Sequence, residues 1–271
     1  MALETFELQN VEPLDRQHDS LILVCLLGSF RLLWRGRPGG NVICGKALTL
    51  LSLLALHLES GVTRESLLNI LWPDQDTKHA NVSLNNLVYT LQRRLRDESD
   101  RTPALVFATG SYYLNRDSGI TTDIASFDAL VSNGDRFIRT GEIAQAVTCY
   151  KQAAALYRGD LSFDFDVASI VERERLRAMF LTVLCWLADH AYQAGKYETA
   201  LQYALRLLSC DPCREDGYRL AMRAYVCRGE RAQALRQYRL CEHVLRREFD
   251  TAPEPLTTEL FERILASPAG V

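Results

Sequence analysis

The segment Ala80–Leu95, ANVSLNNLVYTLQRRL, decides the fold of the N-terminal half of the chain. At about 100° per residue, its large apolar residues fall within about 60° of Leu84 on one side of a helix: Leu87, Val88, Leu91 and Leu95. The opposite side carries amides, hydroxyls, a tyrosine and arginines, and no acidic residue occurs from Ala80 to Arg96. Because such side chains bind base edges and phosphates, the segment predicts an amphipathic helix that contacts nucleic acid.

The segments around this helix indicate the rest of a small domain. Residues 104–115, ALVFATGSYYLN, place two strand-like runs around Thr109-Gly110, which is typical of a β-hairpin. Two helices are expected before the segment Ala80–Leu95, at 46–58 and at 64–71, and Thr63 is the expected N-cap of the second. Residues 21–34 indicate strands around Gly28. This order predicts a winged helix-turn-helix domain over residues 21–118, preceded by a loose, polar arm at residues 1–20.

The charge distribution favours the same segment. The 271 residues are 48% hydrophobic and 24% charged, an ordinary globular composition, with a net charge of −3. Residues 1–20 carry −4, residues 21–116 carry +4 and residues 117–271 carry −3. The positive block is therefore the one that contains the polar-faced helix, which suits a specific DNA binder better than a general polycation.

The second half of the chain contains an internal repeat. Glycine is followed five residues later by alanine, and eight or nine residues later by tyrosine, starting from Gly141, Gly195 and Gly229. The last two copies are 34 residues apart, and the first two are 54 apart, which indicates an insertion of 20 residues around LSFDFDVAS. A period of 34 is the tetratricopeptide signature, in which helix pairs stack because none can bury its apolar face alone. The expected fold is therefore an α+β winged helix-turn-helix followed by an all-α tetratricopeptide-like domain over residues 123–268.

The faces of the expected helix assign candidate DNA contacts. Val82, Asn86 and Tyr89 are expected to reach bases, because Asn suits adenine and Val suits a thymine methyl, while the arginines meet phosphate. The wing tip is expected to touch the sugar-phosphate backbone or minor groove, although a plain turn would explain its residues equally well. The full predicted set is Lys46, Asn81, Val82, Ser83, Asn85, Asn86, Tyr89, Thr90, Arg93, Arg94, Thr109, Ser111 and Tyr112.

Two motifs suggest other chemistry and are weak. Gly40–Ala47, GNVICGKA, approaches a phosphate-binding loop, but Ala47 replaces the Ser or Thr that binds magnesium. Cys210 and Cys213 form a single C-x-x-C with His243 downstream, and Asp211-Pro212 between the cysteines is better explained as a turn. We therefore expect no catalytic residue, no cofactor and no metal.

With these pieces in order, residues 21–265 resemble the Streptomyces antibiotic regulatory protein family. The motifs that carry the resemblance include VTRESLLNILWPD, ANVSLNNLVYTLQRRL and TGSYYLN, then ERERLRAMFL and GERAQALRQYRLCEHVLRREFDTAPEP. Members join an OmpR-type winged helix to a bacterial transcriptional activator domain. Positions 81, 90 and 92, often basic in the family, hold Asn81, Thr90 and Gln92 here. Many relatives also carry a further module. This sequence ends after the repeats, so it resembles the small, stand-alone form of the family.

The resemblance implies a sequence-specific transcriptional activator. It would bind direct repeats in double-stranded promoter DNA through the winged helix, and would contact RNA polymerase holoenzyme and further copies of itself through the helical repeats. No apolar run approaches the length of a membrane span and the N-terminus is acidic, so we expect a bacterial cytoplasmic protein, at the nucleoid when bound to DNA. The alternative is a protein-interaction scaffold in which the winged helix has become a docking module.

Overall fold

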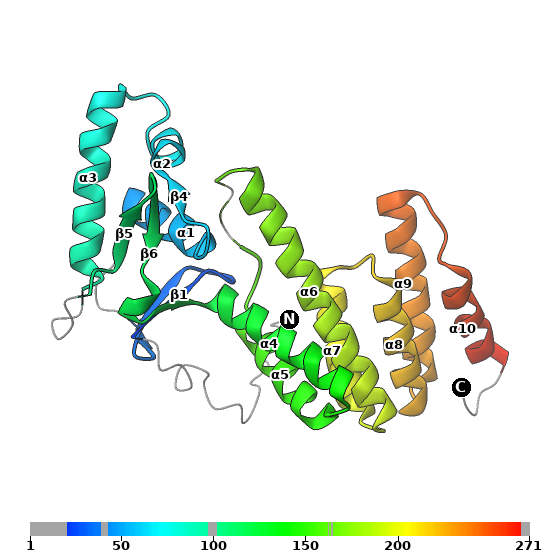
Figure 1. Ribbon diagram of the computed structural model, residues 1–271. Coiled ribbons are helices and arrows are strands. Elements are labelled where there is room, and N and C mark those ends of the chain that lie inside the picture. The colour runs from blue at the N-terminus through cyan, green and yellow to red at the C-terminus, as the bar shows by residue number, and fades with distance from the viewer. Residues whose placement is uncertain (1–20, 39–42, 97–101, 162, 164, 267–271) are drawn as a thin grey trace. The chain divides into compact units, whose positions relative to one another are not determined.

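The computed structural model describes residues 21–38, 43–96, 102–161, 163 and 165–266, and the chain forms two compact units (Figure 1). The described residues up to Leu130, together with Ala155–Glu174, make up the first unit. Val131–Ala154 and the described chain from Arg175 onward make up the second. The predicted arm at residues 1–20 lies outside the described residues.

A four-stranded sheet begins the first unit, in the order β3-β2-β1-β7. Its strands are β1 (Ile22–Cys25), β2 (Arg31–Trp34), β3 (Arg37–Pro38) and β7 (Ile120–Thr122). β1 is antiparallel to β2 and parallel to β7. All four residues of β1 are buried, as expected for an apolar strand that is covered on both faces.

Three helices and a second sheet follow. The helices are α1 (Lys46–Leu56), α2 (Arg64–Leu71) and α3 (Thr77–Arg94), and the strands are β4 (Val62–Thr63), β5 (Leu105–Ala108) and β6 (Ser111–Leu114) in the order β4-β6-β5. Thr63 caps α2 as predicted, because its hydroxyl oxygen accepts a hydrogen bond from the Ser66 backbone N–H at 3.1 Å. The expected winged-helix order of helices and hairpin is confirmed.

A buried carboxylate joins the N-terminal sheet to the helix that follows β7, α4 (Asp123–Thr140). Asp123 is 1% exposed, and its two oxygens accept the backbone N–H groups of Leu26 at 2.8 Å and Leu27 at 2.9 Å. Burial raises the pKa of Asp123 to about 6, while the two backbone hydrogen bonds and Arg31 act in the opposite direction. The beginning of α4 is therefore fixed to the chain that follows β1.

The segment Ala155–Glu174 explains the irregular spacing of the repeats. It has the length of the insertion that the sequence indicates, and it belongs to the first unit. The Gly28 backbone N–H donates to the Asp160 carbonyl at 3.3 Å, and Leu27 forms a bridge with Leu161. The ring centroids of Phe127 and Tyr157 lie 5.6 Å apart. The inserted residues thus pack on the first sheet and on the start of α4.

The helices that follow α4 are regularly punctuated. They are α5 (Ile143–Leu156), α6 (Val167–Gln193), α7 (Tyr197–Cys210), α8 (Glu215–Cys227), α9 (Arg231–Phe249) and α10 (Pro255–Ala266). The repeated glycines Gly141, Gly195 and Gly229 have φ of 80°, 70° and 78°. In each copy, the N–H of the residue after glycine donates to the carbonyl five residues earlier, at 2.8–2.9 Å. This is a Schellman motif, so each repeated glycine ends a helix in the left-handed conformation that glycine adopts most easily.

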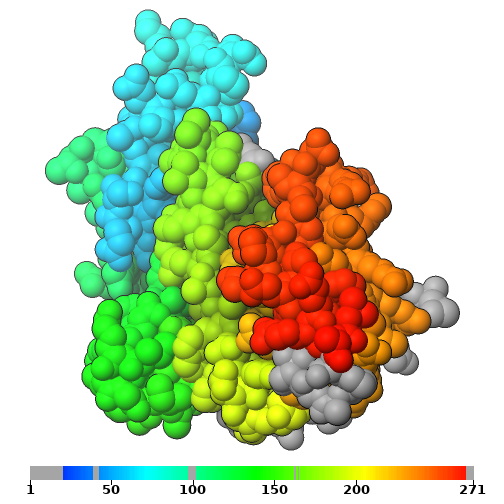
Figure 2. Space-filling model, turned by 90° about the vertical axis from the view of Figure 1, so that its right-hand side faces the viewer, coloured from blue at the N-terminus to red at the C-terminus, as the bar shows by residue number. Residues whose placement is uncertain are grey.

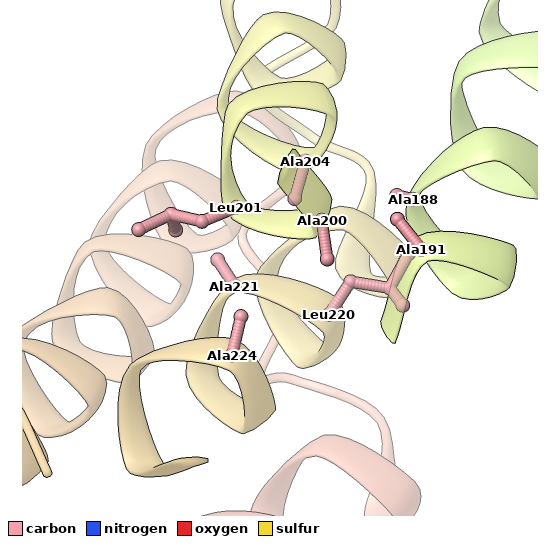
Figure 3. Packing of buried hydrophobic residues seen from close by; sticks show 8 residues of the cluster. All are labelled: Ala188, Ala191, Ala200, Leu201, Ala204, Leu220, Ala221 and Ala224. Carbon is pink, nitrogen blue, oxygen red and sulfur yellow. The ribbon is translucent and has the colours of Figure 1, made fainter. Parts of the chain in front are cut away.

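Small side chains let the helices of the repeats approach closely. Figure 3 shows a buried cluster in which alanines of three helices face one another. Its members are Ala188 and Ala191 of α6, Ala200, Leu201 and Ala204 of α7, and Leu220, Ala221 and Ala224 of α8. Ala146 and Ala234, which correspond to Ala200 in the other copies, are also fully buried. The predicted all-α repeat architecture is confirmed.

The last helix, α10, is held at both ends by charged side chains, and Figure 2 shows it beside α9. At its N-terminus, the Glu215 carboxylate accepts the Glu254 backbone N–H at 2.9 Å and the Thr257 hydroxyl at 2.6 Å. At its C-terminus, the Arg231 guanidinium donates to the Ile264 and Leu265 carbonyls, each at 2.9 Å. Both charges have the sign that the helix dipole favours at that end.

Lowering the pH is expected to stabilise the wild-type protein relative to Asp123→Asn. Between the ordinary pKa of 3.8 and the folded value of about 6, only the folded state holds this proton. The free energy of unfolding of the wild type minus that of Asp123→Asn should therefore increase by up to about 3 kcal/mol as the pH falls from 6 to 4. Urea unfolding at a series of pH values measures the difference. A difference that stays constant over this range would contradict the assignment.

Glu215→Ala is expected to loosen α10. The change leaves the Glu254 N–H and the Thr257 hydroxyl without their acceptor, at a cost of about 1–3 kcal/mol. Limited proteolysis should then cleave the C-terminal helix faster than in the wild type. Glu262→Ala removes an exposed carboxylate from the same helix and is the matched control; equal cleavage of the two variants would show that Glu215 does not hold α10.

Candidate nucleic-acid interface

The outward face of α3 presents the side chains that the helical pattern predicts. Val82 and Tyr89 are 61% and 69% exposed, large fractions for apolar and aromatic residues, and Asn86 and Arg93 are exposed on the same face. On the opposite face, Leu84 and Leu91 are completely buried. The predicted division of the helix into a packed and a free face is confirmed, whereas contact with DNA stays a prediction.

Arg64, the first residue of α2, connects this helix to the wing. Its guanidinium Nε donates to Asn81 Oδ1 at 2.8 Å, Nη2 donates to Asn85 Oδ1 at 2.9 Å, and Nη1 donates to the Tyr112 hydroxyl at 2.6 Å. The Arg64 backbone N–H also donates to the Gly110 carbonyl in the wing turn at 3.0 Å. One half-buried residue thus holds α2, α3 and β6 in a fixed arrangement.

Arg64 is absent from the predicted set, although the sequence holds a signal for it. A cation directly after the N-cap Thr63 lies at the end of the helix where the dipole disfavours positive charge. Such a placement indicates specific acceptors elsewhere in the fold. The pattern could not name those acceptors, because they are 17, 21 and 48 residues away along the chain.

The wing differs from the prediction in which side chains it exposes. Ser111 and Tyr112 were expected at the exposed tip, but they are 9% and 6% exposed. The reason is that β6 is the central strand of its sheet, and the Tyr112 hydroxyl turns toward Arg64. Phe107, which the prediction did not include, is 53% exposed and its ring lies 4.7 Å from that of Tyr112. The exposed wing therefore consists of Phe107 and the turn at Thr109, with Val106 and Ala108 beside them.

The hairpin turn itself has the geometry that its sequence suggests. Thr109 and Gly110 have φ of 50° and 83°, and both central residues of a type I′ turn require positive φ. The turn sets the pairing of Ala108 with Ser111. Thr109 is exposed, as expected for a wing-tip residue.

The other predicted residues lie around the same face. Lys46 is exposed at the first position of α1, with its ammonium 4.4 Å from the centre of the Trp72 ring. The Thr90 hydroxyl donates to the Asn86 carbonyl at 2.8 Å, and Asn81 Nδ2 donates to the Thr77 carbonyl at 2.7 Å. Ser83 and Arg94 are half-buried. The surface therefore combines free side chains with others already engaged within the protein.

Of the weak phosphate-loop motif, residues 40–42 lie outside the described residues, whereas the C-x-x-C motif is described. Cys210 and Cys213 flank a turn in which Asp211 Oδ1 accepts the Cys213 N–H at 3.0 Å. Within the described ranges, no group of three or more His, Cys, Asp or Glu is arranged to hold a metal ion. No helix in those same ranges is long and apolar enough to cross a membrane.

Comparison with known proteins gives three findings. A family model described as bacterial transcriptional activator domain matches residues 122–265. Regulatory protein DnrI of Streptomyces peucetius is 27% identical over 237 residues, which cover 84% of this chain and 87% of that protein. The structure of Mycobacterium tuberculosis EmbR in complex with a low affinity phosphopeptide matches with a TM-score of 0.73 at 22% identity, covering 92% of this chain and 66% of that one. This chain thus spans just under two thirds of the EmbR chain, and that likeness is one of fold.

Tyr112→Phe is expected to destabilise the first unit by about 1–2 kcal/mol, because Arg64 Nη1 loses its acceptor in a half-buried position. Tyr113→Phe, one residue along, is the matched control, since no hydrogen bond of its hydroxyl occurs among the described residues. Thermal unfolding followed by circular dichroism measures both variants. Equal shifts in Tm would mean that the Arg64–Tyr112 hydrogen bond contributes nothing measurable.

Proposed function

Because the chain belongs to the bacterial transcriptional activator domain family and is a regulator of the Streptomyces antibiotic regulatory protein type, we propose that it activates transcription by binding direct repeats in promoter DNA. The family is one of regulators rather than enzymes. The observation that carries the proposal is the outward face of α3, which is exposed, free of acidic residues and built on a winged-helix framework.

The major groove of B-DNA admits an α-helix and displays a distinct pattern of donors and acceptors for each base pair. With α3 in this groove, Val82, Asn86 and Tyr89 would face bases. Arg93, near the C-terminal end of the helix, would meet phosphate. The exposed wing at Phe107 and Thr109 would lie against the sugar-phosphate backbone or the minor groove, and Lys46 would contact phosphate from the start of α1.

The helical repeats are proposed to contact protein: RNA polymerase holoenzyme and a neighbouring copy on the adjacent direct repeat. Tandem sites in the same orientation call for head-to-tail protomers rather than a two-fold dimer. The inserted segment of the first unit adds a further candidate surface, because the exposed apolar side chains of Val167, Ile170 and Val171 share one face at the start of α6.

A protein-interaction scaffold is the second candidate. It is favoured by the engagement of Asn81 and Asn85 with Arg64, which ties polar groups of α3 to the protein, and by the net charge of −3. A scaffold of this kind would bind no DNA sequence specifically at low salt and would form a stable complex with another protein.

Nuclease protection on the DNA upstream of its own and neighbouring genes tests the proposal. Protected sites should occur as direct repeats, and binding should weaken steeply with salt. Asn86→Ala should relax the base preference at one position by about tenfold, whereas Arg93→Ala should weaken all sequences alike. If neither substitution alters DNA affinity, α3 is not the reading helix.

A further inference from the structure

Resting on the proposed function, we infer that Arg64 sets how two adjacent asparagines of α3 read DNA. Asn85 is held with its amide oxygen toward Arg64, so that it presents its amide nitrogen as a donor, whereas the amide of Asn86 is not oriented by Arg64. Arg64 is thus a positioning residue for sequence specificity, although it lies on a different helix.

The inference begins with the chemistry of the guanidinium group. Arginine carries five N–H donors and no acceptor. The amide atoms that face it, at 2.8 Å in Asn81 and 2.9 Å in Asn85, must therefore be the carbonyl oxygens. An asparagine side chain can ordinarily turn by 180° and exchange its oxygen and nitrogen. Arg64 removes that freedom from both residues.

Asn81 is engaged through both of its amide atoms. Its oxygen faces Arg64 Nε, and its nitrogen donates to the Thr77 carbonyl at 2.7 Å. The side chain is half-buried. Asn81 therefore contributes to the position of Arg64 and not to reading bases.

Asn85 presents its amide nitrogen, because Arg64 fixes which way the amide faces. Its oxygen is directed at Arg64 Nη2, the side chain is exposed, and no acceptor for its Nδ2 occurs among the described residues. The paired contact of asparagine with adenine needs the oxygen to accept from N6 and the nitrogen to donate to N7. With one lone pair of its oxygen used and the oxygen fixed toward Arg64, Asn85 can donate to an acceptor such as guanine N7 or O6 or thymine O4 without requiring an amino group on the base.

Asn86 differs from Asn85 in that Arg64 does not bind its amide oxygen. It is exposed, and neither of its amide atoms has a hydrogen-bond partner among the described residues; the Thr90 hydroxyl binds its backbone carbonyl instead. Asn86 can therefore present oxygen and nitrogen together to an adenine edge.

Base analogues in a protected site test the inference. Asn85→Ala and Asn86→Ala first identify the base pair that each residue reads, as the position where discrimination is lost. Replacing a purine there by its 7-deaza analogue removes the N7 acceptor, and replacing adenine by purine removes the 6-amino donor. At the Asn86 position, loss of either group should weaken wild-type binding about tenfold. At the base pair that Asn85 reads, loss of the base acceptor should weaken wild-type binding about tenfold, whereas loss of an amino group should leave binding unchanged.

Two variants then change the chemistry with little change in shape. Asn85→Asp keeps an oxygen for Arg64 and replaces the outward donor by an acceptor, so its preferred base should become one with an exposed amino group, such as cytosine. Arg64→Lys keeps the positive charge but cannot donate to three acceptors in a fork. Arg64→Lys should make DNA binding depend on an amino group of the base that Asn85 contacts. The same substitution should have no such effect in an Asn85→Ala background. Circular dichroism confirms that each variant is folded.

The outcomes separate this inference from the function on which it rests. If the wild-type protein binds no DNA specifically, both are wrong. If binding is specific but the wild-type Asn85 position already requires a base amino group, or Asn85→Ala alters no position, only the role of Arg64 is wrong. Retention of the wild-type base preference by Asn85→Asp would overturn it as well.

Discussion

The half-buried guanidinium of Arg64 is the constraint on which the proposed DNA-reading surface depends. A charged group with many donors is costly to bury unless acceptors surround it, and here they come from α3 and β6, with a backbone link to the wing turn. Because those elements are distant in sequence, no local preference fixes their arrangement. Together with the apolar core, the requirement to satisfy one side chain does so, and it places α3 and the hairpin in register with each other.

The two units obtain their stability in different ways. Besides its apolar core, the first has specific polar links between distant segments, of which the Asp123 carboxylate is the most deeply buried. The second relies on repetition: each copy ends a helix with the same glycine motif and packs alanines against the next pair. Specific links fix an exact surface, whereas repeated packing builds an extended one. That division suits the proposed function, in which one unit binds DNA and the other contacts proteins.

The features that follow from periodicity were predictable from the sequence. The two faces of α3, the Thr109-Gly110 turn, the Thr63 cap and the spacing of the repeats each depend on residues close together in the chain. The features that depend on long-range partners were not. The burial of Tyr112 follows from the position of β6 between two other strands, and the engagement of Asn81 and Asn85 follows from a side chain on α2. Periodicity identifies the exposed face of a helix but does not identify which polar groups on that face are already bonded.

The glycine-terminated helices also bear on how such proteins change length during evolution. Each Schellman motif closes its helix with backbone hydrogen bonds that span six residues. Because these hydrogen bonds are local, the end of each such helix does not depend on the length of loops between other helices. Additional residues can enter between repeats without moving the alanines that pack within them, and Ala155–Glu174 is such an addition. Insertions and deletions among relatives should therefore gather between helix pairs, while the 34-residue spacing within the later copies is kept.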